Sequence, residues 1–170
     1  GQSSLVYGAG GVGLNIVQAC AMVSANPIIA IDIVDSKLEL AKQMGATHLI
    51  NSKTMDVETE VSKIIGSKGV DVAIDNTGNP EVIASCYEMT QSEGKTILVG
   101  VASKGNNISI HSLPLHFGKV LTGSHGGECN PSIDIPNYIR LVENGKLQLE
   151  SLITDRFEFF FLYRNFYEID

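Results

Sequence analysis

The chain has 170 residues, 44% of them hydrophobic and 18% charged, which is enough for one domain with a substantial core. Its formal net charge of -7 argues against a nucleic acid or an anionic membrane as partner, because both bind basic surfaces. No segment has the roughly 18 apolar residues of a membrane span, and we expect no signal segment, since the first residues lack a basic and then apolar pattern.

The cysteines and histidines are too dispersed to indicate a metal site or a disulfide framework. Cys20, Cys86 and Cys129 are far apart and form no CxxC pair, so neither a structural zinc nor a secreted disulfide scaffold is indicated. The 4 histidines form no i, i+4 pair and no close cluster with a cysteine. We therefore expect no metal within this chain and a location in the reducing cytoplasm.

Apolar runs and helical periodicities alternate along the chain. The predicted elements are, in chain order, a strand over 5–7, a helix over 12–23, a strand over 28–31, a helix over 36–44, a strand over 48–50, a helix over 57–65, a strand over 70–75, a helix over 80–89, and strands over 96–99 and 120–122. Ser36-Lys37-Leu38-Glu39 reads as a capping box that opens the second helix, and Gly45 is expected to follow its end. The segment 107–110 alternates polar and apolar residues and is expected to form a short extra strand at the sheet edge.

The order of these elements predicts the fold class. The strands are apolar without strict alternation, as in a parallel sheet that helices cover on both faces. Right-handed helical crossovers between six strands leave few possible arrangements. We therefore predict an α/β fold with a doubly wound parallel sheet of six strands in the order 3-2-1-4-5-6.

The turn between the first strand and the first helix carries the strongest functional signal. Gly8-Ala9-Gly10-Gly11-Val12-Gly13 satisfies G-x-G-x-x-G, and Asp32 follows about 20 residues later at the end of the second strand. In this dinucleotide-binding pattern Gly8 allows a sharp turn, Gly10 lets the backbone approach a pyrophosphate, and Gly13 lets the helix pack close to the strand. The Asp32 carboxylate is expected to bond both hydroxyls of the adenosine ribose and to repel a 2′-phosphate, which predicts NAD over NADP.

The helix that begins near Gly11 explains how an acidic chain can bind an anion. Its free N–H groups and its positive dipole end would face the diphosphate. The alternative is that the glycines form an ordinary tight turn and that Asp32 is a solvated strand end. For Lys37 a ribose contact and a plain surface position both remain open.

Segments beyond this turn extend the pattern. They are Ile31-Asp32, Lys37-Leu38, Ala41 to Thr47, Asp75-Asn76-Thr77-Gly78, Leu98-Val99-Gly100-Val101, Thr122-Gly123-Ser124, Asp134-Ile135-Pro136 and Leu152-Ile153-Thr154. With the glycine turn they resemble the medium-chain, zinc-type alcohol dehydrogenases over about residues 3 to 155, and most resemble the aryl-alcohol dehydrogenases in pattern. The resemblance implies a Rossmann domain that binds NAD(H) in an NAD-dependent oxidoreductase, where an alcohol held on zinc gives its hydride to the nicotinamide.

The resemblance also implies roles for individual residues. Val12 would help to seat the pyrophosphate, and Asp32, Ile33 and Lys37 would surround the adenosine ribose. The residues implied for the other half of the cofactor are Asn76, Thr77 and Gly78 along the cleft, Val99, Gly100 and Val101 at the nicotinamide end, and Ser124 and His125 at the carboxamide. No catalytic residue is implied within this chain.

The family places its zinc ligands and proton-relay residues upstream of the glycine turn, whereas only seven residues precede Gly8. We therefore expect residues 1–150 to be the NAD-binding domain and 151–170 to be a tail that returns to a catalytic domain outside this chain. Zinc would be bound only in that domain, and this chain alone would be inactive. The tail departs from the family pattern at Phe159-Phe160-Phe161.

The same pattern leaves alternative functions open, and it also implies partners. A zinc-free quinone or enoyl reductase of the same superfamily is one alternative, although such proteins usually favour NADPH and Asp32 speaks against that. A nucleotide-sensing binding module is another, and methyltransferases use glycine-rich turns with looser spacing. The resemblance implies a small alcohol or aldehyde substrate and a homodimer or tetramer joined through edge strands near 107–110 and 119–122.

Overall fold

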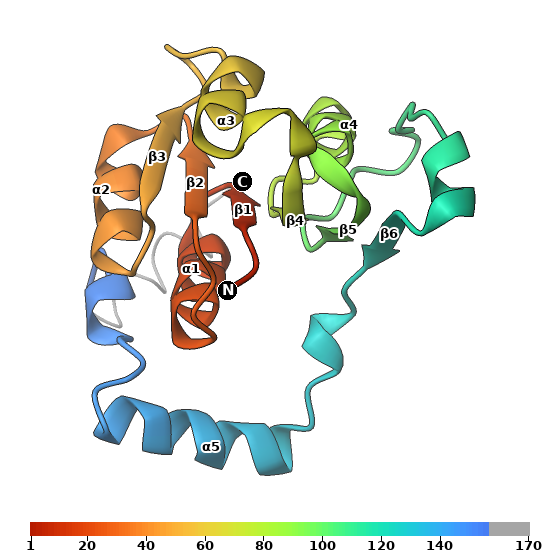
Figure 1. Cartoon of the computed structure of the whole chain (residues 1–170). Coiled ribbons are helices and arrows are strands. Elements are labelled where there is room, and N and C mark those ends of the chain that lie inside the picture. Colours follow the sequence, from red (N-terminus) through yellow and green to blue (C-terminus); the bar gives the residue numbers. More distant parts are fainter. Residues whose placement is uncertain (157–170) are drawn as a thin grey trace, which may run out of the picture.

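A parallel sheet forms the centre of the molecule, of which the computed structural model describes residues 1–156 (Figure 1). The strands are β1 (Ser4–Tyr7), β2 (Ile28–Asp32), β3 (His48–Asn51), β4 (Val70–Asp75), β5 (Thr90–Leu98) and β6 (Val120–Gly123). Their order is β3-β2-β1-β4-β5-β6, and every pairing is parallel. This confirms the predicted doubly wound sheet of the Rossmann type. The tail predicted over 151–170 lies outside the described residues after Arg156.

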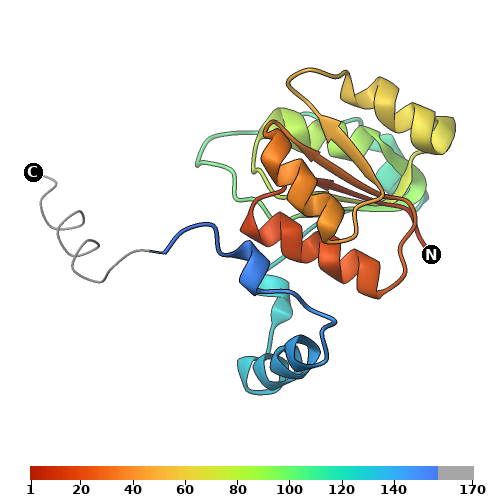
Figure 2. The ribbon, with the colours of Figure 1, turned by 90° about the vertical axis from the view of Figure 1, so that its left-hand side faces the viewer.

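Helices cover both faces of the sheet (Figure 2). Within residues 1–156 the α-helices are α1 (Gly11–Met22), α2 (Asp35–Gln43), α3 (Val57–Ile65), α4 (Pro80–Glu88) and α5 (Pro131–Glu143). α1 and α2 pack on one face, where Val17 joins the apolar cluster, and α3 and α4 pack on the other, where Val61 does. Leu5 and Val6 are neighbours in β1 and belong to opposite clusters. Burial on both faces therefore explains why the strands lack polar alternation.

The start of α2 differs from its predicted form. Val34 precedes the helix and no side chain caps it, so the capping box predicted at Ser36 is wrong. The carboxylate of Asp32 instead accepts the N–H groups of Ile33 and Val34, and Ser36 lies exposed inside the helix. The end of α2 is as predicted, because Gly45 follows it with a φ of +112°.

Near the edge of the sheet, one predicted strand was too short and another was wrong. β5 begins at Thr90 and not at 96, because its polar first half pairs with β4 around a register shift between Val70 and Val72. No strand forms over 107–110, where the two isoleucines are half-buried without strand pairing. The alternation in that segment therefore reflects the burial of two side chains, and β6 is the outer strand.

The segment after β6 leaves the sheet and carries α5, which lies apart from the strands (Figure 2). The chain then returns to α1, where the side-chain amide of Gln18 donates to the Gln148 carbonyl at 3.0 Å and accepts the Gln148 N–H at 2.8 Å. Apolar side chains on α5 are about half exposed, namely Ile133, Ile135, Tyr138 and Ile139. No helix among residues 1–156 combines the length and the apolar character needed to cross a bilayer.

Tyr87 ties α4 to the chain that enters β6. The side chain is fully buried, its hydroxyl donates to the His111 carbonyl at 3.0 Å, and the Lys119 ammonium lies 4.2 Å from its ring centroid. Tyr87→Phe removes that hydrogen bond and should lower the free energy of unfolding by about 1 kcal/mol in urea denaturation. Tyr138→Phe, at a half-exposed position of α5, is the matched control and should change it by less than about 0.5 kcal/mol. Equal losses in the two variants would contradict this role.

Candidate functional site

The glycine turn joins β1 to α1 in a conformation that requires two of its glycines. Gly8 has a φ of +96°, which L side chains rarely adopt. A Cβ on Gly13 would lie 1.8 Å from the Gly8 carbonyl oxygen, so the helix packs against the strand end at a distance that only glycine permits. The tasks predicted for these two residues are thus visible in the fold.

The other two glycines of the turn are not needed for packing. A Cβ on Gly10 or on Gly11 would meet no atom within 4 Å. The first intrahelical bond of α1 runs from the Leu14 N–H to the Gly10 carbonyl, and neither a capping side chain nor an acidic residue occupies the first turn. By contrast, the Asp56 side chain caps α3. The amino end of α1 therefore offers N–H groups and a positive dipole to an anion from outside the chain.

Asp32 lies beside this turn and its side chain is held in place. The residue is 7% exposed, so it is not the solvated strand end that the alternative interpretation required. One carboxylate oxygen accepts the Ala9 N–H at 2.7 Å, and the other accepts the N–H groups of Ile33 and Val34 at 2.8 and 3.0 Å. A carboxylate has about four acceptor positions, so about one remains for a ligand. Ile33, the next residue, and Lys37, in the first turn of α2, are exposed.

The loop after β4 reaches the same edge of the sheet. The side-chain amide of Asn76 lies 3.4 Å from the Gly8 carbonyl oxygen, to which it donates. Asn76 also borders Gly13, since a Cβ there would lie 3.2 Å from its amide nitrogen. The structure therefore brings Asn76 together with the glycine turn, as the sequence predicts for residues that line one cleft.

The loops after β4, β5 and β6 also lie next to one another. A Cβ on Gly100 would lie 2.2 Å from the Gly78 nitrogen, and one on Gly78 would lie 2.5 Å from the Val101 carbonyl oxygen. The Ser124 N–H donates to the Leu98 carbonyl at 2.8 Å. The remaining residues predicted in this region, Thr77, Val99 and His125, follow the same three strands. All of them stand at the carboxyl ends of the strands, where doubly wound sheets bind ligands.

One residue of this edge received no role from the sequence. Asp75, the last residue of β4, is fully buried and bonds both neighbouring loops. A carboxylate at the end of an apolar strand, followed by a threonine and a glycine two and three residues later, was the available signal. The Val99 and Gly100 N–H groups that bond its backbone carbonyl come close only when β4 and β5 pair.

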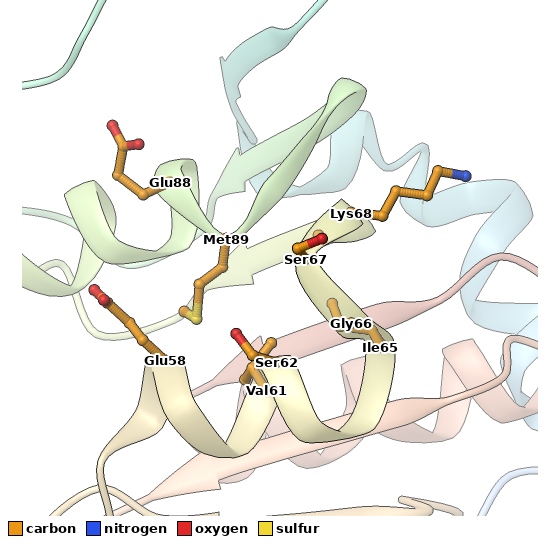
Figure 3. Close-up of a pocket in the computed structure, with 10 residues that line it drawn as sticks. Glu58, Val61, Ser62, Ile65, Gly66, Ser67, Lys68, Glu88 and Met89 are labelled. Carbon is orange, nitrogen blue, oxygen red and sulfur yellow. The ribbon is translucent and has the colours of Figure 1, made fainter.

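A separate hollow lies at the other end of the strands, where β4 and β5 begin (Figure 3). It has a volume of about 200 Å³ and lies between α3, the turn Gly66–Lys68 and the end of α4, with Glu58, Lys68 and Glu88 among its lining residues. Because β4 and β5 begin beside it, this hollow is on the amino side of the strands, away from the glycine turn. Among residues 1–156 no group of three or more His, Cys, Asp or Glu residues is placed to hold a metal ion.

Comparison with known proteins identifies the family. The sequence model of the zinc-binding dehydrogenases matches residues 11–144. The chain belongs to the zinc-binding dehydrogenase family. It is 32% identical over 163 residues to an S-(hydroxymethyl)glutathione dehydrogenase of Paracoccus denitrificans, an alignment that covers 91% of this chain and 43% of that protein.

Solved structures of similar fold agree with this membership. The benzyl alcohol dehydrogenase of Acinetobacter calcoaceticus superimposes with a TM-score of 0.80 and 39% identity over 85% of this chain and 40% of its own. A protein of Sinorhizobium meliloti named as a zinc-binding dehydrogenase and bound to NADP has a TM-score of 0.79 and 25% identity over 91% of this chain and 45% of its own. The chain thus spans less than half the length of these relatives, and it is homologous to the nucleotide-binding domain of alcohol dehydrogenases.

Proposed function

We propose that residues 1–150 are the NAD(H)-binding domain of a zinc-dependent alcohol dehydrogenase. The observation that carries this proposal is the uncapped amino end of α1, which stands between an open glycine turn and the fixed carboxylate of Asp32. A positive helix end and an oriented carboxylate are the two groups that a dinucleotide needs, one for its diphosphate and one for its ribose. Membership in the family supports the same function.

The residues of this edge fit the two halves of NAD. Gly10, Gly11 and Val12 leave the diphosphate free access to the first turn of α1, since Val12 is 56% exposed and the two glycines face open space. Asp32 keeps about one acceptor position for a ribose hydroxyl, and Ile33 and Lys37 are exposed and therefore accessible to a ligand. The nicotinamide half would lie along the loops of Asn76 to Gly78, Val99 to Val101, and Ser124 and His125. When bound, NAD supplies the carbon that accepts or donates a hydride.

The choice between NAD and NADP depends on the charge of Asp32. A 2′-phosphate on the adenosine ribose would bring negative charge to a nearly buried carboxylate, which is unfavourable. The Sinorhizobium meliloti protein is bound to NADP, whereas we propose NAD for this chain. A similar fold therefore does not by itself decide the cofactor. We therefore assign NAD to this chain on Asp32 and not on family membership.

The catalytic step and the assembly involve parts of the protein beyond these residues. Zinc, its ligands and the substrate, a small alcohol or aldehyde, would belong to a catalytic domain that the tail 151–170 would reach. In this proposal the chain itself binds and orients the cofactor. β6 is the outer strand of the sheet, with Val120 39% exposed, and pairing of two such edges would give a homodimer or tetramer. The three dispersed cysteines, which form no CxxC pair, favour the reducing cytoplasm.

Titration of the 170-residue chain with NADH, followed by nicotinamide fluorescence, tests the proposal. We expect saturable binding, with NADPH at least about ten-fold weaker because of the repulsion at Asp32. S-adenosylmethionine should not displace NADH. No saturable fluorescence change with either dinucleotide, or displacement by S-adenosylmethionine, would overturn the assignment, and oxidation of an alcohol by this chain alone would overturn the division into two domains.

A further inference from the structure

We propose that Asp75 is a positioning residue that holds the two backbone segments on which the nicotinamide half of the cofactor lies. The inference rests on the proposed function and adds a residue to it. Asp75 would not touch the cofactor. It would act through Thr77, Gly78 and Gly100, whose backbone groups it fixes.

The side chain of Asp75 fixes the loop after β4. One carboxylate oxygen accepts the Thr77 N–H at 3.0 Å and the Thr77 hydroxyl at 2.7 Å, and the other accepts the Gly78 N–H at 3.0 Å. Gly78 has a φ of +69°. Because glycine can adopt many other backbone conformations, the hydrogen bond from its N–H to Asp75 helps to hold the loop in this one. The carboxylate thus fixes Thr77 and Gly78 relative to the end of β4.

The backbone of the same residue fixes the loop after β5. The Asp75 carbonyl accepts the N–H groups of Val99 and Gly100 at 2.8 and 3.0 Å. The two loops then meet so closely that a Cβ on Gly100 would lie 2.2 Å from the Gly78 nitrogen. A shift of either loop must therefore move the other, and Asp75 is the residue bonded to both.

The carboxylate of Asp75 is buried and is stabilised by hydrogen bonds and not by an ion pair within the described part of the chain. The residue is 0% exposed, and neither ion pair among residues 1–156 involves it, so hydrogen-bond donors alone compensate its charge. A buried carboxylate of this kind is costly unless its acceptor positions are filled. An apolar residue would serve packing equally well, whereas only an acceptor can hold three loop donors.

Asp75 and Asp32 flank the end of β1 on its two sides. Tyr7, the last residue of β1, pairs with Ile31 on one side and with Asp75 on the other. Asp32 accepts the Ala9 N–H of the glycine turn, and Asp75 holds the loops after β4 and β5. Each half of the doubly wound sheet thus has its own buried carboxylate, one on the proposed adenosine side and one on the proposed nicotinamide side.

Asp75→Asn in the full 170-residue chain tests this division. Asparagine keeps the shape but turns one acceptor into a donor that faces an N–H group. We expect the dissociation constant of NADH to rise at least about ten-fold, because the loop after β4 loses its fixed position and the loop after β5 packs directly against it. The dissociation constant of ADP, which has only the adenosine and diphosphate parts, should change by less than about two-fold.

Asp71→Asn is the matched control. Asp71 lies in the same strand at its other end, and its carboxylate likewise accepts three donors, from the Ser3 backbone, the Ser3 hydroxyl and Gln91. This variant should lose stability and keep the affinities for both NADH and ADP. Parallel weakening of NADH and ADP by Asp75→Asn, or no weakening of NADH, would overturn the role of Asp75 while the proposed function stands.

A second variant covers the case in which Asp75→Asn does not fold. Thr77→Val removes the hydroxyl donor to Asp75 and keeps the volume of the side chain. It should weaken NADH and spare ADP in the same selective way, and equal changes for both ligands would again overturn the inference. Absence of NADH binding by the unaltered chain would instead contradict the proposed function itself, so the two failures are distinct.

Discussion

Gly13→Ala should destabilise the chain by about 3 kcal/mol, and NADH binding should weaken because α1 must move away from the glycine turn. The added Cβ would lie 1.8 Å from the Gly8 carbonyl oxygen and 2.9 Å from its carbon, which are backbone atoms that cannot turn aside. Overpacking of this kind typically costs about 1–3 kcal/mol, and contact with backbone places the change at the upper end. Urea denaturation followed by circular dichroism measures the loss.

Gly10→Ala separates the needs of the ligand from those of the fold. No atom lies within 4 Å of its missing Cβ, and its φ of −75° and ψ of −172° suit alanine. The free energy of unfolding should therefore stay within about 0.5 kcal/mol of the original value. A diphosphate that approaches this backbone would meet the new methyl group, so NADH affinity should fall at least about ten-fold. Unchanged affinity would show that the turn is only a structural feature.

Local sequence patterns predicted the sheet and its helices because burial on both faces leaves continuous apolar runs. Leu5 and Val6 each have a cluster to join, so no polar residue interrupts β1. The pattern failed where hydrogen bonds decide the structure. Ser36 matched a capping box, but α2 begins one residue earlier, at Asp35. The Asp32 carboxylate accepts the N–H groups of the two residues between β2 and α2, so the start of the helix depends on where β2 ends.

The site was predictable in part for the same physical reason. Gly8, Gly13 and Asp32 belong to one continuous stretch of chain whose spacing follows from the geometry of a strand, a turn and a helix. The carboxylate of Asp75 bonds residues two and three positions on, but its link to the loop after β5 exists only after β4 and β5 have paired, so local spacing does not show that it joins the two loops. The same holds for β5, whose polar first half is a strand only because β4 lies beside it.

Asp32→Ser should weaken NADH binding by about 10- to 100-fold and leave NADPH binding unchanged or stronger. A hydrogen bond to a charged acceptor contributes about 1.5–3 kcal/mol, and each 1.4 kcal/mol is ten-fold in affinity. Loss of the carboxylate also removes the repulsion that a 2′-phosphate would meet. Fluorescence titration with each dinucleotide measures both changes. Because Asp32 accepts the Ala9 N–H, thermal unfolding of the variant should be recorded alongside and will show some loss.

Asp35→Asn tests whether the preference for NADH depends on a direct contact between Asp32 and the ribose or on the net negative charge of this region. Asp35 begins α2, is exposed, and is bonded to the Asn51 side chain, so its removal takes away one negative charge near Asp32 without touching the glycine turn. Charges at exposed positions are screened and contribute little. The preference for NADH over NADPH should therefore persist in Asp35→Asn and vanish in Asp32→Ser. An equal loss of preference in both variants would mean that the region selects by its net charge, and the assignment of the ribose to Asp32 would then be wrong.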